Sequence, residues 1–300
     1  MRDLEWVIRS PSLLSSALAV ELPWTEKFER LRKDSQPLRD FLNSRPSSGR
    51  LGNWFEALVG YALRESESEP IDWISGVAIR EASHTQGELD LIFRPQSQLL
   101  GFEHWELAVK FYLCIARSPC EAHRLESYVG QALLDRLDLK LSHLIEKQLP
   151  LARTAQARAH LESLGFRGEP VSRLFMKGRL FYPRSWNPSE VRLPEAISPA
   201  HERGWWMAWN AEEFLGWAGD ARWVILPKKR WLGRVETDVE PQSSREVAET
   251  LDEHFRTSRN AIQLARLQPA FEGGYCEALW PEAPGRGMIL CPGWPSSGPY

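Results

Sequence analysis

The segment GELDLIFRPQSQLLGFEHWELAVKFYL, residues 87–113, reads as two strands separated by a turn around Pro95. Side chains alternate between the two faces of a strand, so Glu106 and Lys110 share one face of the second strand, while its other face is mostly apolar. If the two strands are neighbours, Asp90 of the first stands beside Glu106 of the second. The pattern therefore predicts two carboxylates and a lysine on one face of a sheet.

A helix before these strands contributes a third acid. LGNWFEALVGYALR, residues 51–64, has apolar residues on nearly every side, as expected of a buried helix. Gly52, Glu56 and Gly60 are spaced by four residues, so Glu56 lies on a ridge between two glycines, where a helix can approach a sheet closely. An unpaired carboxylate in such a contact is strongly unfavourable. We therefore expect Glu56 to meet a lysine, an arginine or a metal ion.

The order of these elements resembles the core of the PD-(D/E)XK nucleases: an acidic helix, a hairpin, a strand with an aspartate, then a strand with an acid and a lysine. The resemblance covers residues 51–140, and GELDLI at 87–92 is close to the G-E-[IL]-D-[IL]-I form common in resolvase and restriction-like members. Over nearly its full length the chain also resembles an uncharacterised bacterial family at the margin of that superfamily. The stretches that carry this second resemblance are DLEWVIRSPSLL, LGNWFEALVGYAL, GELDLIF, HWELAVKFYL, DRLDLKLSHLIEKQL, GWW and RGMILCPGWP.

The resemblance implies an α/β fold with a restriction-endonuclease-like core, in which a mixed central sheet is flanked by helices. It also implies a site for Mg²⁺ or Mn²⁺, because hard carboxylate oxygens suit these ions. Asp90 and Glu106 would hold the ion, and Glu56 would bind it directly or through water. The ion would lower the pKa of a bound water and stabilise charge on the scissile phosphate, while Lys110 would position the water or neutralise the transition state.

One departure from the pattern leaves two functions open. The usual acid-x-lysine motif has an alanine here, at Ala108, and Glu106 lies one pleat further back on the same face. The first function is a metal-dependent nuclease or phosphodiesterase. The second is a non-catalytic descendant of the nuclease fold that binds protein or nucleic acid. The position that Glu106 reaches decides between them.

The net charge limits how a nucleic acid can bind. The formal charge is −3, so a polyanion needs a local basic patch rather than a global positive field. A helix predicted over 131–149 offers one candidate, with an ordinary solvated face as the alternative reading, and Gln131 at its start could assist. Its basic flank contains Arg136, Lys140, His143 and Lys147, and its apolar face contains Leu133, Leu134, Leu137, Leu141, Leu144 and Ile145.

The C-terminal part has a different character. Of the 14 tryptophans, seven lie between residues 186 and 231, which favours core packing, with a protein-binding surface at Trp205, Trp206 and Trp209 as the alternative. A Ser243-x-x-Glu246 capping box opens a helix predicted over 244–266. We divide the chain into an N-terminal helical segment (1–50), a nuclease-like core (51–170) and a Trp-rich α+β region (171–300) that can complete the same sheet.

Cysteine usage and hydropathy predict a cytoplasmic protein without a membrane partner. The four cysteines form no CxxC pair and no zinc-ligand spacing. The N-terminal stretch lacks the apolar run of a signal peptide, and no stretch long enough to span a bilayer occurs.

Overall fold

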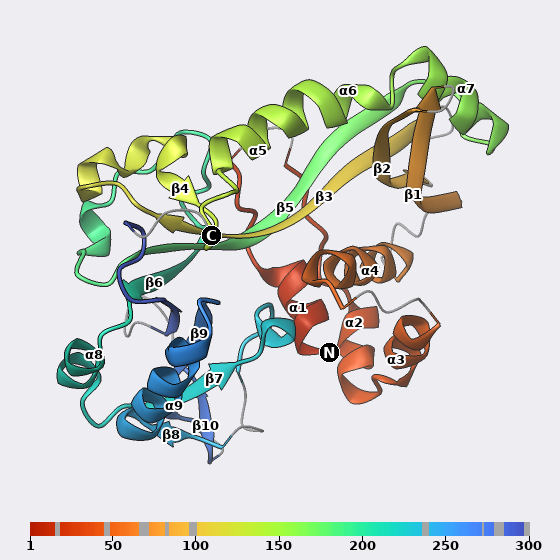
Figure 1. Ribbon diagram of the computed structural model, residues 1–300. Helices are drawn as coiled ribbons and strands as arrows, with labels where there is room; N and C mark the ends of the chain where they lie inside the picture. The colour runs from red at the N-terminus through yellow and green to blue at the C-terminus, as the bar shows by residue number, and fades with distance from the viewer. Residues whose placement is uncertain are drawn as a thin grey trace. The chain divides into compact units, whose positions relative to one another are not determined.

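The computed structural model describes residues 1–15, 19–44, 49–65, 72–81, 84–95, 101–235, 240–271, 273–278 and 285–296. The chain is an α/β protein with a large mixed sheet flanked by helices (Figure 1). It divides into two compact units. The first contains residues 1–110, 139–178 and 196–200, and the second contains 111–138, 179–195 and 201–300. Strands β3 (Phe102–Cys114) and β5 (Pro170–Pro183) each begin in the first unit and end in the second.

The first unit is built on an antiparallel hairpin and two long strands. β1 (Asp72–Glu81) pairs with β2 (His84–Arg94), and β2 pairs antiparallel with β3, Leu91 lying opposite Trp105. The turn predicted after Pro95 falls mostly on 96–100, outside the described residues. β5 follows β3 in the sheet order. Gly178 makes this approach possible, since its φ is +152° and a Cβ there would lie 1.8 Å from the carbonyl oxygen of Lys110.

Helix α4 (Leu51–Arg64) covers one face of these strands. Phe55 stacks on Phe175, and Phe175 stacks in turn on Trp105 of β3. Gly60 lets the helix approach the sheet, because a Cβ at this position would lie 3.3 Å from the ring of Trp73. Three short helices complete this layer, with contacts between α1 and α4, between α3 and α4, and between α2 and α3. They are α1 (Arg2–Arg9), α2 (Glu26–Lys33) and α3 (Gln36–Asn43).

A second helical layer covers the opposite face of β2 and β3 (Figure 1). It runs from α5 (Leu137–His143) through a π-helical turn (Leu144–Gln148) to α6 (Leu149–Leu151), and then to α7 (Ala155–Ser163). Its core side chains include Leu151 and Leu161, which pack with Ile92 and Phe102 of the sheet.

The helix predicted over 131–149 begins six residues later than expected. Residues 131–136 form a turn in which the Gly130 N–H donates to the Asp135 carbonyl at 2.7 Å, and Leu133 has a φ of +60°. The hydroxyl of Tyr112 on β3 donates to the Asp135 carboxylate, which fixes this turn. Leu134 and Ile145 are 74% and 49% exposed, so the predicted apolar face is wrong at both positions. A tertiary hydrogen bond here overrides a helical spacing of leucines.

In the second unit, parallel and antiparallel pairs are mixed. β6 (Glu202–Ala208) is parallel to β5 and to β11 (Arg286–Leu290), whereas β9 (Ile262–Pro269) is antiparallel to β11 and to β7 (Arg222–Leu226). Three short strands extend the sheet: β4 (Tyr128–Val129) beside β3, β8 (Gln242–Ser243) beside β7, and β10 (Tyr275–Glu277) beside β9. The 3₁₀ turns are Pro119–His123, Leu125–Ser127, Pro188–Glu190 and Lys228–Arg230.

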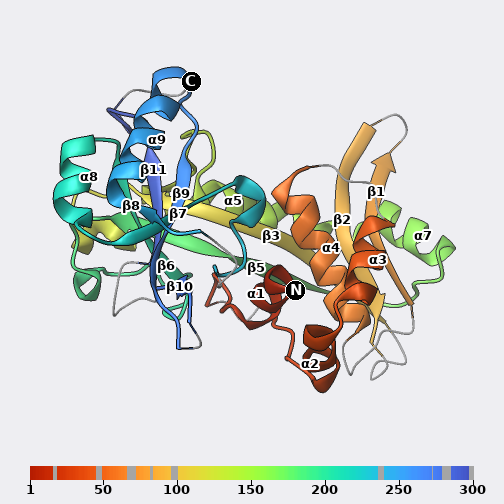
Figure 2. The ribbon, with the colours of Figure 1, turned by 90° about the horizontal axis from the view of Figure 1, so that it is seen from below.

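Helices α8 (Ala211–Ala218) and α9 (Ser244–Thr257) lie side by side over this sheet (Figure 2). The core beneath them is rich in tryptophan, as expected from the sequence, and includes Trp205, Trp209 and Trp223. The capping box is confirmed, because the Ser243 hydroxyl accepts from the Glu246 N–H while the Glu246 carboxylate accepts from the Ser243 N–H.

The helix predicted over 244–266 ends at Thr257, so its last nine residues were assigned to the wrong element. From Ile262 the chain forms β9, where Leu264 and Ala265 are fully buried between β7 and β11. Strand pairing with both β7 and β11 outweighs the helix propensity of the residues in β9. Among the described helices, none combines the length and the apolar character that crossing a membrane requires.

Candidate functional site

Asp90 lies where the regular pairing of β2 with β3 ends. Leu91 pairs with Trp105 on β3. At Asp90 the side chain, rather than the main chain, makes the hydrogen bond to β3, because its Oδ2 accepts from the main-chain N–H of Leu107 at 2.8 Å. The half-buried carboxylate thus replaces a main-chain hydrogen bond between the two strands. This anchors Asp90 to the strand that carries Glu106.

The surroundings of Asp90 raise its pKa from the ordinary value of 3.8 to about 8. Burial is the largest cause, and repulsion by the Glu106 carboxylate comes next; Glu56 adds a smaller repulsion. The Leu107 N–H and the ammonium of Lys140 act in the opposite direction and do not offset these effects. Charged groups from α4, β2, β3 and α5 therefore converge here, with three acids among them.

Glu106 is held from two sides and is only 3% exposed. Its Oε1 lies 2.8 Å from His104 Nε2, and the other ring nitrogen of His104 lies 3.2 Å from the hydroxyl of Ser172 on β5. The Nε2 of Gln148, from the π turn, is 3.4 Å from Oε2. His104 is a fully buried residue between strands, and it fixes the orientation of the Glu106 carboxylate.

Glu56 occupies a position that differs from the sequence-based expectation, whereas Lys110 lies on the predicted face of its strand. Glu56 is exposed at the rim of α4, because the close helix–sheet contact is made at Gly60 rather than at Glu56. Lys110 is on the Glu106 face of β3 but four residues further on, which is about 13 Å along a strand. Ala108, between the two, is buried.

Lys140 and Gln148 complete the site, and sequence reasoning missed the part that each plays. Lys140 was predicted to contact nucleic acid on an exposed flank, but it is half-buried and acts on Asp90. Gln148 was not singled out at all. Their spacing of eight residues gave no signal, because in a regular α-helix such residues differ by about 80° around the axis. The π turn between them advances less per residue and brings them closer to one side.

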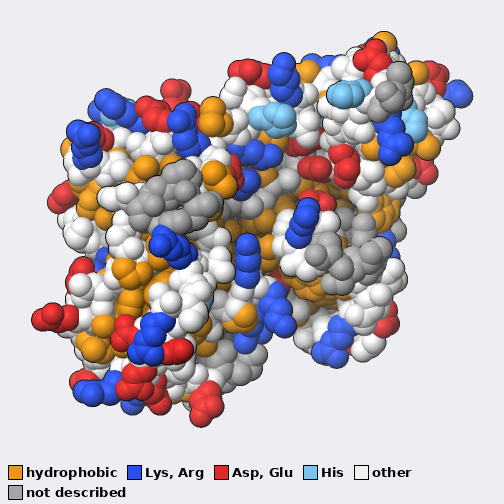
Figure 3. Space-filling view, viewed as in Figure 1, with side chains coloured by type: hydrophobic (Ala, Val, Ile, Leu, Met, Phe, Trp, Pro, Cys, Tyr) orange, Lys and Arg blue, Asp and Glu red, His pale blue; other side chains and the backbone are white. Residues whose placement is uncertain are grey.

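The other predicted nucleic-acid contacts fall partly in each of the two compact units. Arg136 precedes α5 and pairs with Asp138 at 2.6 Å, and the main-chain oxygen of Gln131 accepts from the Trp294 indole. Both belong to the second unit, whereas His143 and Lys147 are exposed on the first. Basic and acidic side chains are interspersed over the face seen in Figure 3.

The donor set fits a magnesium ion held by few protein ligands. In the part of the chain that the structure describes, no group of three or more His, Cys, Asp or Glu side chains is placed to hold a metal ion. Asp90 and Glu106 nevertheless supply two neighbouring carboxylates. Mg²⁺ typically takes one or two carboxylates and fills its remaining positions with water and phosphate oxygens. The pair suits such an ion better than it suits zinc, which prefers nitrogen and sulfur ligands in a closed site.

Comparison with known proteins identifies a family without assigning an activity. A family model described as a domain of unknown function, DUF1853, matches residues 2–289. The chain therefore belongs to this family, which confirms the resemblance to an uncharacterised family. The match does not connect the chain to the PD-(D/E)XK nucleases. No curated protein and no solved structure was found to match the chain.

Proposed function

We propose that this member of the DUF1853 family is a Mg²⁺-dependent nuclease or phosphodiesterase with a PD-(D/E)XK-like core. The order α4, β1–β2 hairpin, β3, helical layer and β5 is consistent with that core. The observation that carries the proposal is the convergence of Asp90 with Glu106 and Glu56 at a site where burial, and after it repulsion by Glu106, raises the pKa of Asp90 to about 8. Clustered acids with strongly shifted pKa values are more common at functional sites than elsewhere.

In this proposal Asp90 and Glu106 hold the ion, and Glu56 reaches it through water. When bound, the ion supplies a water of lowered pKa and stabilises negative charge on the scissile phosphate. Because His104 Nε2 contacts Oε1 of Glu106, Oε2 is the oxygen available to bind the ion. Gln148, at 3.4 Å from Oε2, would orient that oxygen or a water beside it. Such outer contacts fix the direction of a metal-binding carboxylate.

Lys140 is the lysine that we assign to the reacting phosphate. Its ammonium lowers the pKa of Asp90, whereas the backbone of Lys110 lies about 13 Å along β3 from that of Glu106. An ammonium beside two metal-binding carboxylates would neutralise charge that develops on the phosphate oxygens. Lys110 is kept as the alternative, because the sequence motif favours it.

A specific observation also supports the second function, a non-catalytic binding module. The usual acid position holds Ala108, and Glu106 already has His104 and Gln148 as partners inside the protein. A carboxylate satisfied in this way can serve structure alone. In that case the nuclease-like core would position a surface that binds protein or nucleic acid.

The test combines cleavage with metal binding. Single- and double-stranded DNA and RNA are incubated with the wild type in Mg²⁺, in Mn²⁺ and in EDTA, beside Asp90→Asn, Glu106→Gln and the exposed control Asp220→Asn. We expect metal-dependent cleavage by the wild type and by the control, and cleavage reduced to background in both site variants. Mg²⁺ should raise the thermal midpoint of the wild type, because a ligand of the native state stabilises it, and this increment should disappear in Asp90→Asn.

This experiment distinguishes the metal-dependent nuclease from the non-catalytic binding module. A wild-type midpoint that ignores both ions at millimolar concentration, together with no cleavage of any substrate, would remove the nuclease and leave the binding module. Cleavage that survives Asp90→Asn would place the chemistry elsewhere in the chain.

A further inference from the structure

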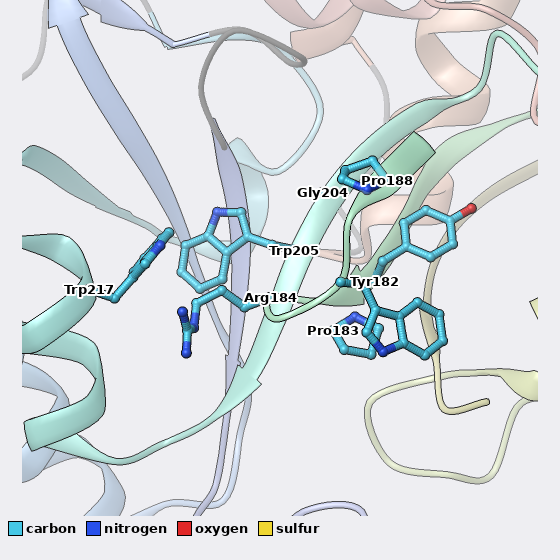
Figure 4. A pocket seen from close by; sticks show the side chains of 8 residues that line it. Tyr182, Pro183, Arg184, Pro188, Gly204, Trp205 and Trp217 are labelled. Carbon is cyan, nitrogen blue, oxygen red and sulfur yellow. The ribbon is translucent and has the colours of Figure 1, made fainter. Parts of the chain in front are cut away.

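An aromatic cavity in the second unit is too small to hold a substrate. Its lining includes Tyr182, Arg184, Trp205 and Trp217, and its volume is about 60 Å³, which is room for about two water molecules (Figure 4). The cavity therefore adds nothing to the proposed function. A feature that does bear on the candidate site lies in the first unit, in the β1–β2 hairpin that carries Asp90.

Strands β1 and β2 both change the face to which their side chains point, and they do so at the same level. In a regular strand, residues three apart point to opposite faces. Ile74 and Val77 of β1 nevertheless pack into one core cluster, and so do Leu89 and Ile92 of β2. These residues are paired across the hairpin, Ile74 with Ile92 and Val77 with Leu89. This change of side, here called the face reversal, therefore falls between the two pairs in both strands.

Gly76 is the residue at which β1 departs from strand conformation. Its φ is +68°, in the left-handed region that residues other than glycine rarely adopt. The residues on either side of Gly76 pair with those on either side of Asp90, so these two lie opposite each other. A Cβ added at Gly76 would meet one described atom, Oε1 of Glu88, at an ordinary distance of 3.4 Å. A glycine is thus needed here for its backbone conformation and not for lack of space.

The face reversal explains why the Asp90 carboxylate lies between two strands. Side chains of a regular strand stand roughly perpendicular to the sheet. Asp90 Oδ2 instead accepts the main-chain N–H of Leu107 on β3 at 2.8 Å, and the pairing of β2 with β3 stops at Leu91, the next residue. β-Bulges beside active sites redirect a side chain in a similar way. Here the orientation changes without an inserted residue, because the register of β1 with β2 continues across Gly76.

We infer that Gly76 is a positioning residue: its left-handed conformation produces the face reversal and thereby places the Asp90 carboxylate beside Glu106 as an ion ligand. The role as an ion ligand rests on the proposed function. The placement of the carboxylate does not, and it can be observed directly at the Leu107 amide. A glycine that served only local stability would leave the bond between Asp90 and Leu107 unchanged when replaced.

The experiment uses the full chain with substitutions at Gly76 and at a matched glycine. Valine does not adopt the left-handed region without strain, whereas asparagine does so more readily. Gly76→Val should therefore straighten β1, Gly76→Asn should preserve its conformation, and Gly76→Ala should lie between them. Gly165→Val is the control, because Gly165 of the same unit has a φ of +94° and no described atom within 4 Å of an added Cβ. Asp90→Ala is the reference in which the acceptor of the Leu107 N–H is removed.

Three quantities are measured for each variant. Hydrogen exchange of the Leu107 amide, followed by NMR, reports the bond to Asp90. The rise of the thermal midpoint with Mg²⁺ concentration reports ion binding, and urea unfolding reports global stability.

We expect the Leu107 amide of Gly76→Val to exchange about tenfold faster or more, as in Asp90→Ala, because the N–H loses a charged acceptor. The Mg²⁺ concentration that gives half of the midpoint increment should rise about tenfold, as for other groups that orient a metal ligand. Gly76→Asn should behave like the wild type in both measurements, and Gly76→Ala should be intermediate. Gly165→Val should lose a similar amount of global stability as Gly76→Val and change neither quantity.

Three results would overturn the inference. One is unchanged Leu107 exchange in a folded Gly76→Val. Another is equally fast exchange in Gly76→Asn, which would make side-chain volume the cause and not backbone conformation. The third is equally fast exchange in Gly165→Val, which would mean a general loosening of the unit. If Gly76→Val does not fold, the comparison of Gly76→Ala with Gly76→Asn decides in the same way.

Failure of the proposed function would have a different signature. A wild-type midpoint that does not respond to Mg²⁺ would remove the ion, and with it the role of Asp90 as a ligand. Exchange at the Leu107 amide would still decide whether Gly76 positions the Asp90 carboxylate.

Discussion

At the scale of single residues, two acids show opposite net pKa shifts although burial raises the pKa of both. Burial raises the pKa of Glu277, but the Arg286 guanidinium lowers it further, so the net shift is downward. Their carboxylate and guanidinium are joined by two bonds, at 2.5 and 3.0 Å, as in a structural ion pair. At Asp90 the pKa is raised instead, because burial and the repulsion of Glu106 exceed the effect of Lys140. Arg286 therefore offsets the burial of Glu277, while Lys140 does not offset the burial of Asp90 and the repulsion of Glu106.

The raised pKa of Asp90 predicts an unusual pH dependence in the absence of metal. The folded state binds this proton more tightly than the unfolded chain, whose ordinary pKa is 3.8. The stabilisation from protonated Asp90 is therefore complete below pH 3.8 and is lost as the pH rises toward about 8. Asp90→Asn should remove this dependence, so that its stability relative to the wild type increases across that interval.

Urea unfolding of both proteins in EDTA, at a series of pH values, measures this difference. Asp220→Asn serves as the control, because that carboxylate is exposed. Millimolar Mg²⁺ should reduce the difference at high pH, since the ion and the proton compete for the same carboxylate. A constant difference between wild type and Asp90→Asn from acid to alkaline pH would show that Asp90 is an ordinary carboxylate.

At the scale of elements, the segment from α5 through the π turn carries two of the groups at the site. Lys140 acts on Asp90 and Gln148 contacts Glu106, although a regular α-helix would turn them apart. Turns of this kind are frequent at functional sites. Lys147, within the same π turn, is exposed. Lys110, Lys140 and Lys147 thus lie on three different elements, β3, α5 and the π turn.

Replacing each of these lysines by methionine distinguishes their roles. Lys140→Met should reduce metal-dependent cleavage most, and it should raise the pKa of Asp90 further, because Lys140 lowers that pKa in the wild type. The pH at which Mg²⁺ begins to raise the thermal midpoint should shift upward accordingly. Lys147→Met should behave like the wild type, and Lys110→Met should leave that pH unchanged. Loss of cleavage in Lys110→Met, with normal activity in Lys140→Met, would return the catalytic role to the lysine of the sequence motif.

At the scale of the whole molecule, the compact units are not consecutive segments of chain. The first unit needs α1 to α3, the strands up to Lys110, the helical layer and the first part of β5. The sequence-based division places the nuclease-like core at 51–170, which omits the N-terminal helices and almost all of β5. In that fragment the apolar faces of α4 and β3 would be exposed to water, and Phe55 and Trp105 would lose Phe175 from between them.

We expect the fragment 51–170 to be unfolded or molten when expressed alone. Burial of these faces supplies most of the stabilisation of a domain of this size. Near-UV circular dichroism and urea unfolding would reveal this as a weak aromatic signal and a broad transition, and the full chain provides the reference. A cooperative transition with a native aromatic signal in 51–170 would establish it as an autonomous domain.

Much of the fold could be predicted from the order of residues alone. The positions of α4 and β3 agree closely with the periodicity of the sequence, while β2 begins at His84 rather than near residue 87. The capping box at Ser243 and the burial of the tryptophan-rich core were also predicted. The acids Asp90 and Glu106 were identified by their places on adjacent strands. These features depend on residues that are close together in the chain, so the spacing of residues in the sequence is sufficient to predict them.

Only the tertiary structure decided which groups meet at the site. It placed the start of α5 at Leu137, left Glu56 at an exposed rim, and brought Lys140 to Asp90 and Gln148 to Glu106. Periodicity shows which side of an element is buried. It does not show how far the element slides or turns against its partner, because contacts between residues distant in sequence, such as Tyr112 with Asp135, determine that.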